Sequence, residues 1–400
     1  MAKGLEDTSF YRYPRLLSLN EVGGAPALFG LTVAVGHRAL AERRARWPGA
    51  LLATATHDTK RGEDSRARLN VLSEIPTEWA RRVRRWARLN KGLRKGRNGT
   101  PRPIDEYFIY QTLVGAWPFE FLAPGRISGS SAAAFLERMR AYLVKALREA
   151  KQETSWLDPD IDYERACLGF LEGLLDRRRS REFIEDLTDF LGEIAPFGVM
   201  NSLAQLILKL TAPGVADIYQ GSELWDLSLV DPDNRRPVDF AARRNMLSDA
   251  MAAASLESPA RRKAWEELRR GWRDGRIKLH VIAALLALRR RCPALFAEGS
   301  YEPLGGSGLA ARHLFAFRRR QGDRGMLVAV GRFFARLHGA SDKELPGGAA
   351  WGSTHLTLPP DSPTSYIDLF TGTRIEAKGR RLALAPLFAL LPVAVLVDEA

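Results

Sequence analysis

The stretch Thr54-Ala-Thr-His-Asp-Thr-Lys-Arg-Gly-Glu-Asp64 decides how the fold of this chain is interpreted. A short apolar run, Ala50 to Ala53, leads into it, and charged residues crowd after the His57-Asp58 pair. An apolar run that opens onto a polar, glycine-containing segment is typical of a buried strand whose end carries a functional loop. The alternative is a solvated charged loop, because charge runs usually lie on exposed faces.

Four other segments carry distinctive combinations of polar and aromatic residues. They are Met1-Ala-Lys-Gly-Leu-Glu-Asp-Thr-Ser-Phe-Tyr-Arg-Tyr13, Ser18-Leu-Asn-Glu-Val-Gly-Gly24, Ile109-Tyr-Gln-Thr-Leu113 and Tyr219-Gln-Gly-Ser-Glu-Leu-Trp-Asp-Leu-Ser-Leu-Val-Asp-Pro-Asp-Asn-Arg-Arg-Pro-Val-Asp239. Together with the His57-Asp58 stretch they resemble, in the same order, maltooligosyltrehalose synthase, a glucan-rearranging family of the α-amylase superfamily. A His-Asp pair alone is a weak signal, but the last segment is long enough to be specific. The resemblance covers essentially the whole chain.

This resemblance implies an α/β fold, made of the C-terminal part of a (β/α)8 barrel with a helical insertion, followed by a C-terminal β-sandwich. It predicts a barrel segment over 1–60, whose strand carries the His-Asp motif, and a helical insertion over 61–195. The last barrel strand and the helices after it are expected over 196–300, and the β-sandwich over 301–400.

The residue pattern supports a mixed fold. Thr77 to Ile194 is helical almost throughout, and from about Tyr301 short strands alternate with Gly- and Pro-containing turns. Expected helices cover 27–46, 61–72, 77–95, 105–115, 132–153, 161–177, 180–194 and 197–211, with one or two more over 265–291. Expected strands cover 51–56, 215–219, 312–319, 325–332, 353–358, 365–368, 381–384 and 392–398.

Retaining glucan chemistry passes through a covalent glycosyl intermediate and an oxocarbenium-like transition state. In the family it needs a nucleophile, a general acid and a third carboxylate that supports the transition state. By resemblance Asp58 matches only the third, which accepts hydrogen bonds from sugar hydroxyls; the alternative is a surface aspartate after a strand. The other two lie, in the family, upstream of the segment that matches Met1. The chain thus resembles the C-terminal half, with a separate N-terminal half as expected partner and a gene-model, cloning or split-gene boundary at Met1.

Three neighbours of Asp58 are predicted to bind substrate. A neutral His57 imidazole can donate to a sugar hydroxyl, or it can be a core histidine held by a backbone carbonyl. Lys60 and Arg61 can contact the glucan, or they can pair with the acidic residues that begin the next helix.

Four more distant residues are predicted substrate contacts. Tyr11 belongs to an aromatic cluster, and aromatic faces suit the apolar C–H surface of sugars; the alternative is a core position. Tyr219, Asp231 and Arg235 follow the strand that resembles the last barrel strand, on the face where barrel active sites lie. The alternative for the charged pair is a capped, salt-bridged loop.

Composition limits the other possibilities. The net charge of +13 would suit nucleic acid, but 49 of the 60 basic residues are arginines scattered over helices, and no nucleic-acid motif accompanies them. No nucleic-acid partner is therefore expected. No run approaches ~18 apolar residues, so no transmembrane helix and no membrane partner is expected. Cys167 and Cys292 lack paired spacing and the six histidines are dispersed, so we expect free thiols in the cytoplasm and no metal site.

We therefore expect the C-terminal portion of a (1→4)-α-D-glucan 1-α-D-glucosylmutase, an isomerase of trehalose biosynthesis. By resemblance it converts the reducing-end α-1,4 bond of a maltooligosaccharide into an α,α-1,1 bond. No cofactor is expected, because carboxylates and positioning carry the chemistry. The portion is expected to be inactive without its N-terminal half. The alternative is a non-catalytic glucan-binding module.

Overall fold

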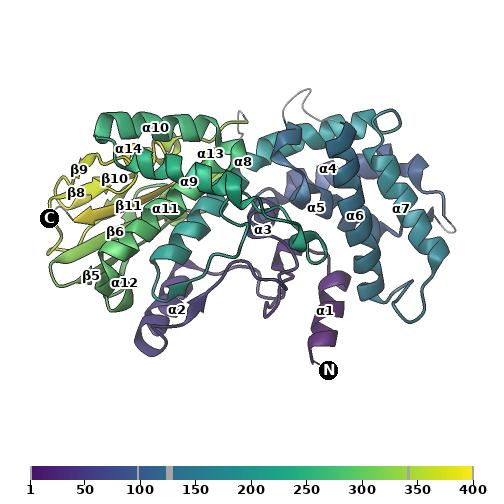
Figure 1. Ribbon diagram of the computed structural model, residues 1–400, viewed down its shortest axis with the longest axis horizontal. Helices are drawn as coiled ribbons and strands as arrows, with labels where there is room; N and C mark the ends of the chain where they lie inside the picture. Colours follow the sequence, from purple (N-terminus) through teal and green to yellow (C-terminus); the bar gives the residue numbers. More distant parts are fainter. Residues whose placement is uncertain (1, 97–98, 123–128, 340–342, 399–400) are drawn as a thin grey trace. The chain divides into compact units, whose positions relative to one another are not determined.

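The computed structural model describes residues 2–96, 99–122, 129–339 and 343–398 (Figure 1). They form two compact units. The helical unit comprises Met1–Phe29, Ala55–Gly198 and Asp226–Pro237, and the sheet unit comprises Gly30–Thr54, Val199–Trp225 and Val238–Ala400. The chain as a whole mixes helices and strands, in agreement with the predicted α/β class. The division into four segments stays a prediction.

The helical unit is built from helices and short 3-10 turns. Its elements are α1 (Ala2–Arg12), η1 (Leu17–Leu19), α3 (Glu63–Asn70), η2 (Val71–Ser73), α4 (Pro76–Leu89), η3 (Lys91–Leu93), α5 (Pro103–Ala116), η5 (Phe119–Leu122), α6 (Gly129–Ala150), α7 (Ile161–Leu175), η6 (Asp233–Arg235) and the first part of α8 (Arg181–Thr211). Trp79 and Trp86 lie two turns apart on α4, and both rings pack against Phe190 of α8. This contact buries the apolar face of an otherwise arginine-rich helix.

Helix α8 differs from the pattern. We predict separate helices over 180–194 and 197–211, whereas the structure has one helix with Pro196 inside it. A proline in a helix interior costs about 3 kcal/mol, but Ala195 and Phe197 beside it are buried, so packing holds the helix together. Among the described residues α8 is the one helix that is long and apolar enough to cross a membrane, but 78% of its apolar window is buried, as in a core helix.

The sheet unit contains the remaining elements. Its helices are α2 (Val33–Arg46), α9 (Phe240–Ala254), α10 (Ser258–Arg270), η7 (Trp272–Asp274), α11 (Arg276–Arg291), α12 (Pro293–Ala297), η8 (Ala311–His313), α13 (Phe334–His338), η9 (Gly348–Trp351) and α14 (Leu384–Leu387). Its strands are β1 (Leu51–Leu52), β2 (Val215–Ala216), β3 (Glu302–Leu304), β4 (Gly306–Ser307), β5 (Leu314–Gln321), β6 (Arg324–Gly331), β7 (His355–Thr357), β8 (Ser365–Asp368), β9 (Arg374–Glu376), β10 (Arg381–Ala383) and β11 (Val393–Asp398).

Two antiparallel sheets share one apolar core in the C-terminal part. One sheet has the order β3-β5-β6-β11-β8-β9 and the other has the order β10-β7-β4. Ala329 and Leu396 from the first sheet belong to the same buried cluster as Leu356 and Leu382 from the second. Strands predicted from Tyr301 onward are present, within a few residues at their ends.

The two strands nearest the site sequence are shorter than expected. We predict strands over 51–56 and 215–219, but β1 and β2 are two residues long each and pair in parallel. The Thr56 hydroxyl accepts from the Asp58 amide at 3.2 Å, and the Thr56 carbonyl accepts from the Thr59 hydroxyl at 2.9 Å. These local bonds compete with strand pairing, because Thr side chains offer the backbone an alternative partner.

Candidate functional site

Segments that are far apart in the sequence converge in the helical unit. The Asn20 side chain donates to the carbonyls of Phe10 and Tyr13, both at 2.8 Å. Glu21 accepts from the Lys60 amide at 2.8 Å, and Gln111 accepts from the Leu17 amide at 3.0 Å. Three of the five quoted motif segments are therefore joined by side-chain-to-backbone bonds, and Gln111 of a fourth segment is bonded to Leu17, the residue directly before Ser18.

Asp58 lies in a turn, and a buried lysine, Lys60, sets the direction of the aspartate side chain. Lys60 is 4% exposed, and its Nζ lies 3.3 Å from an Asp58 carboxylate oxygen and 2.8 Å from one of Asp7. Burial alone would lower the pKa of Lys60, but the hydrogen bonds and charges of Asp7 and Asp58 outweigh it and raise the pKa. Lys60 therefore stays charged and holds the two carboxylates together.

Arg61, the residue after Lys60, is also buried but has different partners. It is 1% exposed, and its Nη2 donates to the Tyr142 hydroxyl at 2.9 Å while Nη1 donates to the Leu17 carbonyl at 3.3 Å. Its guanidinium also lies over the Phe108 ring at 5.8 Å. Arg61 thus anchors the site loop to α5 and α6, as the fork of an arginine allows.

The loop after Asp58 pairs with a second loop, residues 226–237. The Val230 amide donates to the Lys60 carbonyl at 3.1 Å, and the Gly62 amide donates to the Ser228 carbonyl at 2.8 Å. A Cβ at Gly62 would lie 2.5 Å from the Asp226 carbonyl oxygen, so this approach requires glycine. These hydrogen bonds hold the loop that follows Asp58 beside the 226–237 loop.

Asp231 and Arg235 stand on this second loop. An Asp231 carboxylate oxygen lies 2.5 Å from Lys145 Nζ, and the other lies 3.4 Å from Arg235. The hydrogen bond from Lys145 lowers the pKa of Asp231, so its carboxylate is charged at neutral pH. The Arg235 side chain is 70% exposed and reaches solvent.

His57 and the two predicted tyrosines occupy different settings. His57 is exposed, and its carbonyl accepts from Asn234 Nδ2 at 2.9 Å. Tyr11 is buried beside Phe108; burial raises the pKa of its phenol, and its hydroxyl has no hydrogen-bond partner among the described residues. Tyr219 belongs to the sheet unit, where its carbonyl accepts from the Ser222 hydroxyl at 2.6 Å.

The structure thus places six predicted residues on two paired loops: His57, Asp58, Lys60, Arg61, Asp231 and Arg235. It also adds supporting residues that the sequence patterns did not single out. They are Asp7, Glu21, Arg138, Lys145 and Asn234. The i, i+7 spacing of Arg138 and Lys145 was the available signal for the two cations, because such residues share one helix face.

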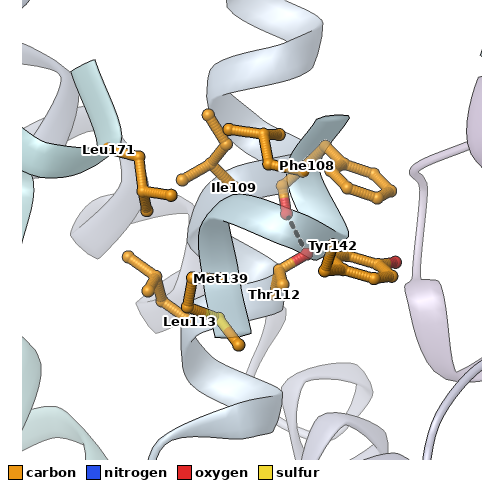
Figure 2. A pocket seen from close by; sticks show the side chains of 8 residues that line it. Phe108, Ile109, Thr112, Leu113, Met139, Tyr142 and Leu171 are labelled. Carbon is orange, nitrogen blue, oxygen red and sulfur yellow. Dashed lines mark hydrogen bonds between the residues drawn. The ribbon is translucent and has the colours of Figure 1, made fainter. Parts of the chain in front are cut away.

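The helical unit also contains a small cavity, whose lining is mostly apolar, unlike the charged loops of the candidate site. Figure 2 shows Phe108, Ile109, Thr112 and Tyr142 among the side chains that line it, from α5 and α6. The cavity has a volume of roughly 10 Å³, and the Thr112 hydroxyl donates to the Phe108 carbonyl at 2.9 Å. This size is close to what one water molecule needs, so a sugar does not fit there.

The described residues therefore define an α/β protein with a carboxylate–lysine site on paired loops, and within them no group of three His, Cys, Asp or Glu side chains could hold a metal ion. No protein-family model matches the chain. Individual relatives do. The chain is 40% identical over 398 residues to a Mycobacterium tuberculosis protein named as a maltooligosyl trehalose synthase, covering all of this chain and 44% of that protein.

Solved structures give the same result. Maltooligosyltrehalose synthase from Arthrobacter ramosus is 36% identical with a TM-score of 0.79, over 100% of this chain and 45% of that one. A Sulfolobus tokodaii hypothetical maltooligosyl trehalose synthase is 30% identical with a TM-score of 0.70, over 98% of this chain and 45% of that one. The resemblance predicted from the sequence is confirmed, and the chain spans about half the length of the relatives that it matches.

Proposed function

We propose that this chain is the C-terminal portion of a maltooligosyltrehalose synthase, an isomerase that rearranges a glucan end in trehalose biosynthesis. The observation that carries the proposal is the similarity of the entire chain to under half of each such relative. A non-catalytic glucan-binding module, the alternative from the sequence, has no support from these comparisons.

The finer fold follows from the same proposal. The parallel pair β1 and β2 is proposed to be part of a (β/α)8 barrel, with the helices over 61–195 as an insertion and the two C-terminal sheets as a β-sandwich. Two parallel strands cannot close a barrel, so the remaining strands would come from an N-terminal half. That half is the proposed partner, and the cytoplasm is the proposed location.

In the proposed mechanism Asp58 accepts hydrogen bonds from the hydroxyls of the sugar under attack. These bonds strengthen as the ring flattens toward an oxocarbenium-like state, so they favour the transition state over the ground state. The nucleophile and the general acid would come from the N-terminal half. Exclusion of water would then decide between rearrangement and hydrolysis.

The other predicted residues take roles that match their positions. Exposed His57 and Arg235 are proposed as direct sugar contacts, and Tyr219 stays a proposed sugar contact on the family resemblance alone. Lys60 is proposed to orient Asp58 and, with Asp231, to supply charge beside the sugar. Arg61 and Tyr11 are buried, so we propose that they support the site without touching the glucan.

The test compares the 400-residue chain alone with a mixture that contains the upstream half, expressed separately. We expect no conversion of maltopentaose by the chain alone and formation of the trehalose-ended product by the mixture, because two catalytic carboxylates are otherwise absent. Robust conversion by the chain alone would contradict the proposal. An Asp58→Asn mixture serves as the matched control for contaminating enzymes.

A further inference from the structure

Helix α6 presents three polar side chains toward the loops of the candidate site. Arg138, Tyr142 and Lys145 stand at i, i+4 and i+7, a spacing that aligns side chains along one face of a helix. Arg138 bonds to Asp233 and Lys145 bonds to Asp231, both on the 226–237 loop. Tyr142 accepts from Arg61 on the other loop. One helix face therefore contacts both of the paired loops.

The Arg138–Asp233 pair joins α6 to the 226–237 loop through two hydrogen bonds. Nε lies 2.7 Å from one carboxylate oxygen and Nη2 lies 3.0 Å from the other, so the pair is bidentate. The Asp233 side chain is 3% exposed and also accepts from the Leu229 amide at 2.8 Å. Arg138 Nη2 donates in addition to the Leu227 carbonyl at 3.3 Å. The pair thus fixes the backbone on the side of the loop that pairs with residues 60–62.

Lys145 holds the middle of the same loop. Its Nζ lies 2.5 Å from the Asp231 carboxylate and 3.0 Å from the Asp231 carbonyl. Three residues later, Asn234 Nδ2 donates to the carbonyl of His57. Because α6 fixes the position of the 226–237 loop, it also fixes the position of His57, the residue directly before Asp58.

We propose that Arg138 and Lys145 are positioning residues that set the place of the 226–237 loop and, through Asn234 and the Lys60–Val230 pairing, the place of His57 and Asp58. The catalytic consequence rests on the proposed function, whereas the structural consequence does not. Helix α6, which lies within the predicted helical insertion, then positions the loops of the candidate site.

The first experiment measures amide hydrogen exchange in the 400-residue chain. In Arg138→Met we expect the Leu229 amide and the amides of 57–60 to exchange at least about tenfold faster, because local opening becomes easier. Lys145→Met should act in the same way on 57–60. The matched control is Arg140→Met on the same helix, which loses ion pairs to Glu137 and Glu172 instead. Equal exchange of 57–60 in Arg138→Met and the control would overturn the proposal.

The second experiment measures kcat and KM of the enzyme reconstituted with its N-terminal half. We expect Arg138→Met to lower kcat at least about tenfold, a change of about 1.4 kcal/mol, with KM changed less than about threefold, and Arg138→Lys to recover part of the loss because it keeps the charge. Unchanged kcat in spite of faster exchange would also overturn the proposal. A wild-type mixture without activity would contradict the proposed function alone, and the exchange result would still decide the positioning role.

Discussion

Charge is used differently in the two units. In the helical unit, cations hold carboxylates at the candidate site. Burial would raise the pKa of Asp233, but the hydrogen bond from Arg138 helps to lower it, and the hydrogen bond from Lys145 lowers the pKa of Asp231 against a smaller effect of burial. In the sheet unit, four histidines are buried or half-buried instead, and burial lowers the pKa of each. They are His37, His280, His313 and His338, the last with a pKa of about 4.

The comparison implies that acid acts on the two units in different pH ranges. A histidine whose folded pKa lies below its ordinary value binds a proton more readily when unfolded, so the sheet unit should lose stability as pH falls below about 6.5. A carboxylate with a lowered folded pKa contributes stability above its ordinary value and loses it as pH falls through the folded one. The helical unit should therefore respond only below about pH 4.

The largest effect is expected where a single charge serves the proposed chemistry. In the reconstituted enzyme, Asp58→Asn keeps the size of the side chain but loses the charge that supports a cationic sugar. We expect kcat to fall by a factor equivalent to about 3 to 4 kcal/mol, with the melting temperature nearly unchanged. His57→Ala should cost less, because it removes a contact and no charge. If Asp58→Asn keeps more than about a tenth of the wild-type kcat, the proposed site is misplaced.

A buried arginine in the sheet unit should rank next, through stability. Arg319 is 0% exposed and donates to the carbonyls of Ser300, Thr211, Phe296 and Gly299. Arg319→Met leaves these acceptors without their donor, so we expect a loss of about 3 kcal/mol in the free energy of unfolding.

The control for that variant is the neighbour Arg320→Met, whose exposed side chain pairs with Asp361. It should cost less than about 0.5 kcal/mol, because exposed ion pairs contribute little. Urea titration of both variants measures the difference. Equal losses would show that burial of the arginine does not matter.

Gly62→Ala tests the helical unit in a similar way. Its Cβ would meet the Asp226 backbone, so we expect a loss of about 2 kcal/mol and weaker pairing of the two site loops. Gly49→Ala is the matched control, because nothing lies within 4 Å of a Cβ there. A stable Gly62→Ala variant with unchanged exchange of the 226–237 amides would contradict the close approach.

Much of this organisation could be predicted from the sequence, and the rest had specific physical obstacles. The His57-Asp58 loop and the Asp231–Arg235 loop were predictable because long motifs marked them. The burial of Lys60 and Arg61 and their different partners were not predictable, since no helix or strand period fixes side-chain direction in a loop. Helix α9 was not predicted, because its sequence has a weak apolar pattern; the Asp239 cap, which accepts from the Ala242 amide at 2.8 Å, was the available signal.

The contacts between α6 and the 226–237 loop could not be predicted from the sequence for a different reason. Arg138 and Asp233 lie 95 positions apart, so no local pattern links them. A charged residue on a helix is most often solvated, and only the fold shows which ones meet a partner. The same holds for Asp7, which reaches Lys60 from α1.

The smallest expected effect isolates one histidine of the sheet unit. His37 Nδ1 lies 2.6 Å from the Tyr301 hydroxyl, and its ring stacks on Phe315 with centroids 4.1 Å apart. His37→Phe keeps the stacking but loses the hydrogen bond, so we expect a cost of about 1 kcal/mol at pH 7.

That cost should shrink between pH 7 and pH 5, because wild-type His37 has a lowered folded pKa and must lose stability as its unfolded form takes up a proton, whereas phenylalanine cannot. Tyr301→Phe is the matched control: it removes the same hydrogen bond but keeps the histidine, so its stability should keep falling with pH. Urea unfolding at pH 7, 6 and 5 compares the two variants. If the cost of His37→Phe is the same at pH 7, 6 and 5, so that the stability of this variant falls with pH as much as that of Tyr301→Phe, His37 does not contribute to the acid response of the sheet unit.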